Sequence, residues 1–192
     1  QATFYHAIAS GYRERSHFDG QNVLECGAAR PYGRDDGWIN RLLTLLPKGE
    51  SKALALANAI PPALRGPITV GSYAPSRLPD ADAGLMERVA MLYAEDAQLA
   101  PLWQSATQTE AMAGGIGPGN GRGGVAAGKL VASLMAGADG ARVAMVETTG
   151  WDTHFNQEGR LGTVLKGVDE MIDTLRTEMG RAGLETLGDP SP

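Results

Sequence analysis

Residues 141–154 read ARVAMVETTGWDTH, and the rest of the chain can be interpreted outward from this stretch. Its first half, Ala141–Glu147, is a short apolar run that predicts a buried strand. A long amphipathic segment follows the second half. Asp152 and His154 therefore fall in a turn between a strand and a helix. Open α/β sheets usually bind ligands at the carboxyl ends of their strands, so the stretch predicts a ligand site at this edge.

The remaining segments alternate between strand and helix patterns, which predicts an α/β protein. Further strands are predicted at 3–9, 52–57 and 68–70. Apolar spacing and capping residues predict helices at 17–25, 38–46 with Asp36 as the cap, 82–93, 98–112, 125–135 and 161–179. So few strands in 192 residues predict a single incomplete α/β domain over residues 1–192. An incomplete sheet leaves open edges, through which a homo-oligomer can form.

The glycine-rich stretch Gly114–Gly124 predicts a flexible loop. Two nucleotide-binding patterns overlap it. Gly119–Gly124 matches G-x-G-x-x-G, but a helical segment precedes it where a dinucleotide site needs a strand. Gly123–Lys129 matches G-x-x-x-x-G-K, but Leu130 follows where a phosphate loop needs Ser or Thr. A flexible polar loop is therefore the preferred interpretation, with a nucleotide-binding protein as an alternative.

Composition excludes several classes of protein. The formal net charge is −5 and no basic run occurs, which argues against nucleic acid as a partner. Cys26 is the only cysteine, so the chain has neither an intramolecular disulfide nor a thiolate zinc cluster. No run approaches the roughly 18 apolar residues of a membrane helix. The chain begins at Gln1 without a leader, so we expect that a leader was removed or that this is a segment of a longer protein.

Asp152 and His154 are the first candidates for chemistry. A carboxylate oxygen and a neutral imidazole nitrogen are usual ligands for zinc, manganese or iron. On a loop, the D-x-H spacing can direct both side chains at one ion. The alternative is structural: Asp152 caps the long helix and His154 lies in its first turn. The spacing alone leaves both interpretations open.

A second loop with an acid and a histidine follows the predicted first strand. Arg13 and Arg15 can clamp phosphate or sulfate there, beside the candidate residues Ser16, His17 and Asp19. Ser16 can serve as a nucleophile if a metal lowers its pKa, although no G-x-S-x-G context supports a Ser-His-Asp esterase. The alternative is a capping serine with solvated arginines. Because both loops carry an acid and a histidine, we expect them to meet over one edge of the sheet.

Four blocks of sequence resemble domain-of-unknown-function family 1501, and their order fits that family. They are Tyr5-His6-Ala7-Ile8-Ala9, Arg15-Ser16-His17-Phe18-Asp19-Gly20-Gln21, Gly37-Trp38-Ile39-Asn40-Arg41-Leu42-Leu43 and Gly150-Trp151-Asp152-Thr153-His154-Phe155-Asn156-Gln157. The resemblance covers most of the chain, from Thr3 to about Met179. The glycine-rich stretch and the C-terminal tail lie outside it.

The resemblance implies a bacterial protein of the alkaline phosphatase and sulfatase superfamily, exported to the periplasm, often by a twin-arginine leader. It implies an α/β sheet with helices on both faces and hydrolysis of small phosphate or sulfate esters. Asp152 and His154 would then hold a divalent metal, either zinc, manganese or calcium. Ser16 lies at the topological place of the nucleophile, and His17, Asp19 and Arg15 would line the pocket.

The chain also departs from the family pattern. Family members begin with a glycine-rich strand and turn carrying an Asp, and no such region precedes Gln1. They continue with E-F-G-R-T-like and T-D-H-G-like motifs, and neither follows Met179. The missing regions would supply further strands and metal ligands, so we expect an incomplete site. Two functions follow as alternatives: a metal-dependent hydrolase, or a non-catalytic exported binding or structural protein that retains the fold.

Overall fold

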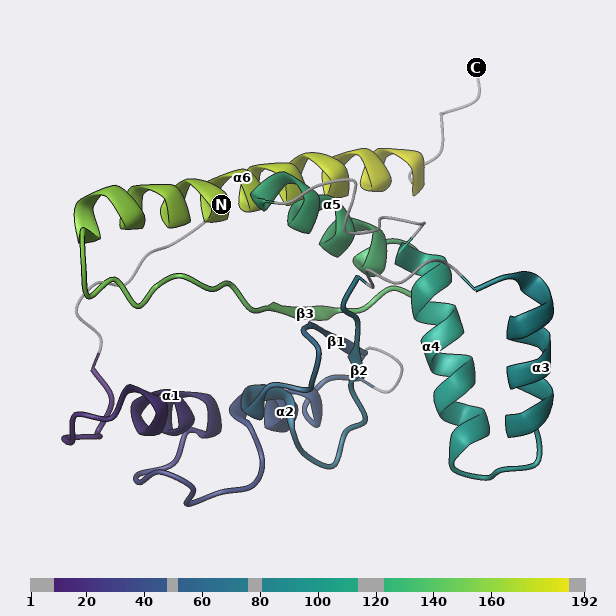
Figure 1. Cartoon of the computed structure of the whole chain (residues 1–192), viewed down its shortest axis with the longest axis horizontal. Helices are drawn as coiled ribbons and strands as arrows, with labels where there is room; N and C mark the ends of the chain where they lie inside the picture. Colours follow the sequence, from purple (N-terminus) through teal and green to yellow (C-terminus); the bar gives the residue numbers. More distant parts are fainter. Residues whose placement is uncertain (1–8, 48–51, 76–80, 114–122, 187–192) are drawn as a thin grey trace. The chain divides into compact units, whose positions relative to one another are not determined.

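A computed structural model describes residues 9–47, 52–75, 81–113 and 123–186 of the chain (Figure 1). The chain divides into two compact units. The first comprises Gln1–Ser51 and Ala59–Val70, and the second comprises Lys52–Asn58 and Gly71–Pro192. Each unit is described by itself below. The predicted strand at 3–9 falls almost wholly outside the described residues, and so does most of the glycine-rich stretch.

The second unit contains a three-stranded parallel sheet, which confirms the predicted α/β class. Its strands are β1 (Ala53–Leu56), β2 (Gly71–Ser72) and β3 (Val143–Val146), in the order β2-β1-β3. Leu54 is aligned with Gly71 of β2 and with Ala144 of β3. Because the strands run in one direction, their carboxyl ends lie at the same edge of the sheet. The predicted homo-oligomer through the outer strands stays a prediction.

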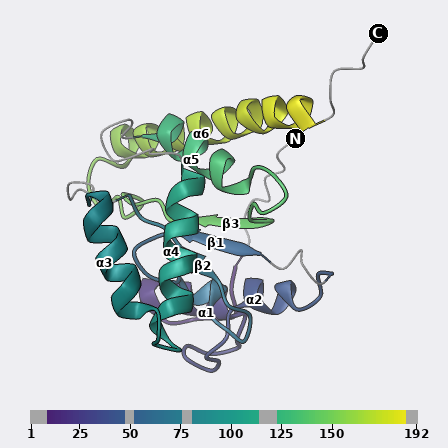
Figure 2. The same ribbon diagram turned by 90° about the vertical axis from the view of Figure 1, so that its right-hand side faces the viewer.

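The second unit contains the four helices predicted for it, three of them within one residue of the predicted boundaries, whereas the last, predicted at 161–179, extends further at both ends. They are α3 (Ala83–Tyr93), α4 (Leu99–Ala113), α5 (Gly124–Met135) and α6 (Gln157–Thr186). The α3 helix packs beside α4, and α5 packs beside α6 (Figures 1 and 2). The core of the unit joins the sheet to α4 and α5 through Leu54, Tyr73, Ala113, Leu130, Leu134 and Ala141. None of the described helices combines the length and the apolar character needed to cross a membrane.

The first unit contains α1 (His17–Cys26), α2 (Trp38–Leu43) and the short 3₁₀ helix η1 (Pro62–Leu64). The helix predicted at 17–25 is confirmed and extends one residue further. The Ser16 side chain caps the start of α1 by accepting a hydrogen bond from the Asp19 N–H at 3.3 Å. Gly27, at φ 63°, ends the helix in the left-handed conformation that glycine adopts most readily.

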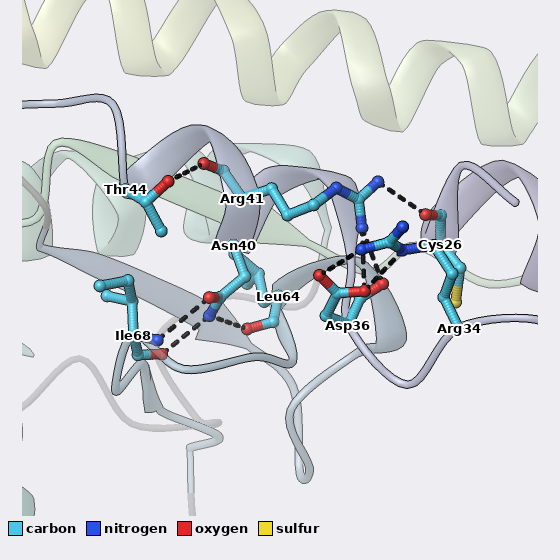
Figure 3. A network of polar contacts seen from close by, with 8 residues as sticks. All are labelled: Cys26, Arg34, Asp36, Asn40, Arg41, Thr44, Leu64 and Ile68. Carbon is cyan, nitrogen blue, oxygen red and sulfur yellow. Dashed lines mark hydrogen bonds and ion pairs between the residues drawn. The ribbon is translucent and has the colours of Figure 1, made fainter.

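The prediction of a helix at 38–46 capped by Asp36 was partly wrong. The helix ends at Leu43, and Leu45 and Leu46 continue in turns with hydrogen bonds to residues three positions earlier. Gly37 is the N-cap. The Asp36 carboxylate instead contacts Arg34 at 2.7 Å and Arg41 at 3.2 Å (Figure 3). The carboxylate that the local pattern predicted as the helix cap is thus held by two arginines.

The predicted strand at 68–70 was also wrong, because β2 begins at Gly71. The Asn40 side chain binds both backbone polar groups of Ile68 (Figure 3). Its amide donates to the Ile68 carbonyl at 2.8 Å, and its oxygen accepts from the Ile68 N–H at 3.1 Å. These are the groups that a strand would use for pairing. The segment is therefore held by one buried side chain.

The Asp36 cluster should make stability depend on pH. The hydrogen bond from Arg34, followed by that from Arg41, lowers the pKa of Asp36 from 3.8 to about 2. A lowered pKa in the folded state stabilises that state above the ordinary pKa, and this stabilisation is lost as the pH falls toward 2. The wild type should therefore resist urea better than Asp36→Asn at pH 6, and the difference should disappear near pH 2.

Asp35→Asn is the matched control, because no described residue forms an ion pair with Asp35. Urea midpoints measured from pH 6 to pH 2 should show a shrinking difference for Asp36→Asn and none for Asp35→Asn. A difference for Asp36→Asn that stays constant over this range would contradict the assignment.

Candidate functional site

The carboxyl edge of the parallel sheet borders a cavity of about 380 Å³ within the second unit. Each strand contributes the residues that directly follow it: Ala57 and Asn58 after β1, Tyr73–Pro75 after β2, and Glu147 and Thr149 after β3. The first turns of α5 complete the lining. The sequence predicted ligand binding at this edge, where open α/β sheets usually bind their ligands.

A second cavity of about 320 Å³ lies between α5 and α6. Both cavities are lined by Gly123, Ala127, Glu147 and Thr149. The sequence did not point to these lining residues as candidates. The available signal was position, because Asn58 directly follows the predicted strand at 52–57 and Glu147 is the last residue of the predicted strand at 141–147. Both predicted segments contain a strand, β1 and β3. Polar residues at those positions are worth testing whenever parallel strands are expected.

Asp152 and His154 lie in the connection between β3 and α6. Because α6 begins at Gln157, Asp152 does not cap it and His154 is not in its first turn, so this alternative was wrong. The structure brings the two side chains together, with His154 Nε2 at 2.6 Å from Asp152 Oδ1. Their side chains are 82% and 64% exposed, respectively. Neither lines either of the two cavities.

Local contacts fix the start of this connection. The Trp151 indole N–H donates a hydrogen bond to Thr148 Oγ1 at 2.7 Å. Gly150 adopts φ 94°, and a Cβ at this position would lie 3.4 Å from Val164 of α6. Glycine is therefore favoured where the chain turns toward Asp152. These contacts position the segment that connects the sheet edge to the exposed side chains of Asp152 and His154.

The other predicted site residues lie in the first unit. Asp19 accepts a hydrogen bond from the Tyr12 hydroxyl at 3.2 Å, while Ser16 caps α1. Arg13 and Arg15 are exposed. The capping serine and exposed arginines agree with the structural alternative. Capping does not exclude the roles predicted for Ser16 and His17 as catalytic residues or for Arg13, Arg15 and Asp19 as substrate-binding residues, so these roles stay predictions.

Asp19 also shapes the charge around this loop. Its hydrogen bond is the main cause that raises the pKa of Tyr32. Burial, followed by the hydrogen bond to Asp19, raises the pKa of Tyr12. The carboxylate therefore keeps two neighbouring phenols protonated. The shared pocket predicted for this loop and the Asp152 loop stays a prediction, because the two loops belong to different units.

The carboxylate of Asp152 and the imidazole of His154 are the kinds of group that bind divalent ions. Within the residues described by the structure, no group of three or more His, Cys, Asp or Glu side chains can hold a metal. Catalytic zinc usually has three protein ligands. The described pair therefore fits an open, largely hydrated ion site better than a closed one.

Fold and site together define an α/β protein with a parallel sheet and polar groups gathered at its carboxyl edge. The model of a family described as protein of unknown function (DUF1501) matches residues 75–187, more than half of the chain. The chain belongs to this family, as the resemblance implied. Of the four blocks that carried the resemblance, the match contains only Gly150–Gln157, and the three blocks between Tyr5 and Leu43 lie outside it. No curated protein and no solved structure matches the chain. The matched segment includes Glu147, Asp152 and His154 but not the loop of the first unit.

Proposed function

We propose that this protein is an exported, periplasmic metal-dependent hydrolase of small phosphate or sulfate esters. The observation that supports the proposal best is the Asp152–His154 pair. Its two donor atoms lie 2.6 Å apart, both side chains are exposed, and the pair follows a parallel strand inside the family segment. An acid and an imidazole placed together near a sheet edge are suited to bind an ion and remain accessible to a substrate.

Each predicted residue has a role in this proposal. Asp152 and His154 hold a divalent ion, either zinc, manganese or calcium. When bound, such an ion supplies Lewis acidity and lowers the pKa of a water or hydroxyl group. Ser16 and His17 are the proposed catalytic residues. The anionic ester is bound by Arg13 and Arg15, whose guanidinium groups suit phosphate and sulfate, with Asp19 beside them.

Protons should compete with the ion at this pair. The Nε2 and Oδ1 atoms that contact each other in the structure are the proposed metal donors. Metal binding requires deprotonated donors and releases protons. The apparent affinity for zinc or manganese should therefore rise with pH in the wild type. Calorimetric titrations between pH 5.5 and pH 8 measure this, and an affinity that does not change with pH would contradict the assigned donors.

The hydrolase itself is tested with 4-nitrophenyl phosphate and 4-nitrophenyl sulfate, after removal of metal and addition of zinc, manganese or calcium. The wild type should show metal-dependent turnover of at least one ester. The double variant Asp152→Asn/His154→Gln should lose on the order of a hundredfold in rate, since the ion supplies several kcal/mol of stabilisation. Asp169→Asn on α6 is the matched control, because its side chain is exposed and outside the pair.

Equal rates in the wild type and the double variant would contradict the roles of Asp152 and His154. Absence of turnover with every ion and both esters would reject the hydrolase. The non-catalytic exported binding or structural protein that retains the fold would then be the better interpretation. Circular dichroism of each variant shows whether a lost rate reflects a lost fold.

A further inference from the structure

We propose that the cavity at the carboxyl edge of the sheet binds a small apolar molecule that carries an ammonium group. This goes beyond the proposed hydrolase, because the cavity is lined neither by Asp152 nor by His154. Its volume of about 380 Å³ lies within the usual range for small-molecule sites, roughly 300–1,000 Å³. Three strand ends and one helix build it, so its walls belong to packed elements.

The walls of the cavity are mostly apolar. The α5 helix contributes Ala126, Ala127 and Leu130. Leu56 comes from β1 and Val146 from β3, and Tyr73 directly follows β2. Leu130 and Tyr73 also belong to the core of the second unit, which holds their side chains in place. Ligand sites commonly combine such an apolar wall with a few polar groups that orient the ligand. The hydrocarbon part of the ligand therefore contacts this wall.

Among the described residues that line the cavity, Glu147 is the only charged one. No described residue forms an ion pair or a side-chain hydrogen bond with Glu147. The other polar side chains of the described lining are neutral: Asn58, Tyr73 and Thr149. The amino end of α5 contributes a partial positive charge of about half a unit, so the part of the lining that the structure describes stays negative overall. This charge favours a cationic group and disfavours a carboxylate or phosphate.

Three rigid probes with one hydrocarbon body separate these contributions: 1-adamantylamine, 1-adamantanol and 1-adamantanecarboxylate. Binding to the full chain is followed at pH 7 by chemical shifts of the protein amides. The ammonium should bind about fivefold more tightly than the alcohol, since an exposed ion pair contributes up to about 1 kcal/mol. The carboxylate should bind most weakly. The shifts should include residues that follow all three strands.

Two variants test the assigned wall and charge. Glu147→Gln should remove the preference for the ammonium over the alcohol, whereas Glu110→Gln, an exposed position on α4 outside the cavity, should preserve it. Ala127→Leu should weaken the binding of all three probes by filling the space. Equal affinity for amine and alcohol in the wild type, no saturable binding, or a preference that survives in Glu147→Gln would overturn the proposal. Asp152→Asn/His154→Gln should not change ammonium binding, which separates this test from that of the hydrolase.

Discussion

Gly128→Ala should destabilise the second unit by about 2–3 kcal/mol, although alanine is the better helix former. A Cβ at Gly128 would lie 2.6 Å from the Met171 carbonyl oxygen and 2.8 Å from Thr174 Cβ, both on α6. A backbone oxygen cannot turn away as a long side chain can. The two helices must therefore separate or shift, which exposes the apolar surface that α5 buries.

Gly124→Ala should have an effect of the same kind, since a Cβ there would meet the Gly167 carbonyl oxygen. Gly162→Ala on α6 is the matched control. A Cβ at Gly162 would meet no atom within 4 Å. That variant should gain about 0.5–1 kcal/mol from helix propensity alone. Urea unfolding followed by circular dichroism gives all three values, and a Gly128→Ala protein as stable as Gly162→Ala would show that α5 and α6 do not approach this closely.

Asn40→Ala should destabilise the first unit by about 3–4 kcal/mol, since each buried polar group left without a partner costs about 1–3 kcal/mol. Asn40 is fully buried at 0% exposure. Its amide donates to the carbonyls of Leu64 and Ile68, and its oxygen accepts from the Ile68 N–H (Figure 3). One truncation thus leaves three backbone groups without their partner.

Asn58→Ala is the control for this prediction, because Asn58 is exposed and makes no side-chain hydrogen bond with a described residue. Its free energy of unfolding, measured with urea, should stay within about 0.5 kcal/mol of the wild-type value. Asn40→Asp should also be destabilised, because the aspartate keeps an acceptor for Ile68 but loses both donated bonds. If Asn40→Ala unfolds at the wild-type urea concentration, this side chain does not hold the segment at Ile68.

Capping residues and apolar spacing were sufficient to predict the helices whose ends and buried faces depend on residues nearby in the sequence. Ser16 and Gly27 bound α1, Asp82 caps α3, and the apolar spacing of 161–179 gives the middle of α6. The errors occurred where a distant side chain decides the outcome. Asn40 holds Ile68 across 28 residues, and no pattern near 68–70 reveals that contact. Asp36 has the sequence position of a cap, but Arg34 and Arg41 hold its carboxylate.

The candidate site divides in the same way. Asp152 and His154 are two residues apart, so their proximity could be predicted from the sequence. The cavity could not, because Asn58, Tyr73 and Glu147 come together only through the pairing of three parallel strands. The sequence alone predicted which edge of the sheet binds ligands. The residues that line the cavity at this edge became known only from the order of the strands.

The most direct test of the proposed function is a titration of the ¹⁵N-labelled chain with Mn²⁺, whose unpaired electrons broaden the signals of nearby amides. If Asp152 and His154 hold the ion, the amides of residues 148–156 should broaden first, at Mn²⁺ concentrations below that of the protein. This broadening should be absent from Asp152→Asn/His154→Gln and unchanged in Asp169→Asn. Broadening that is equal in the wild type and the double variant, or that spares residues 148–156, would contradict the proposed metal site.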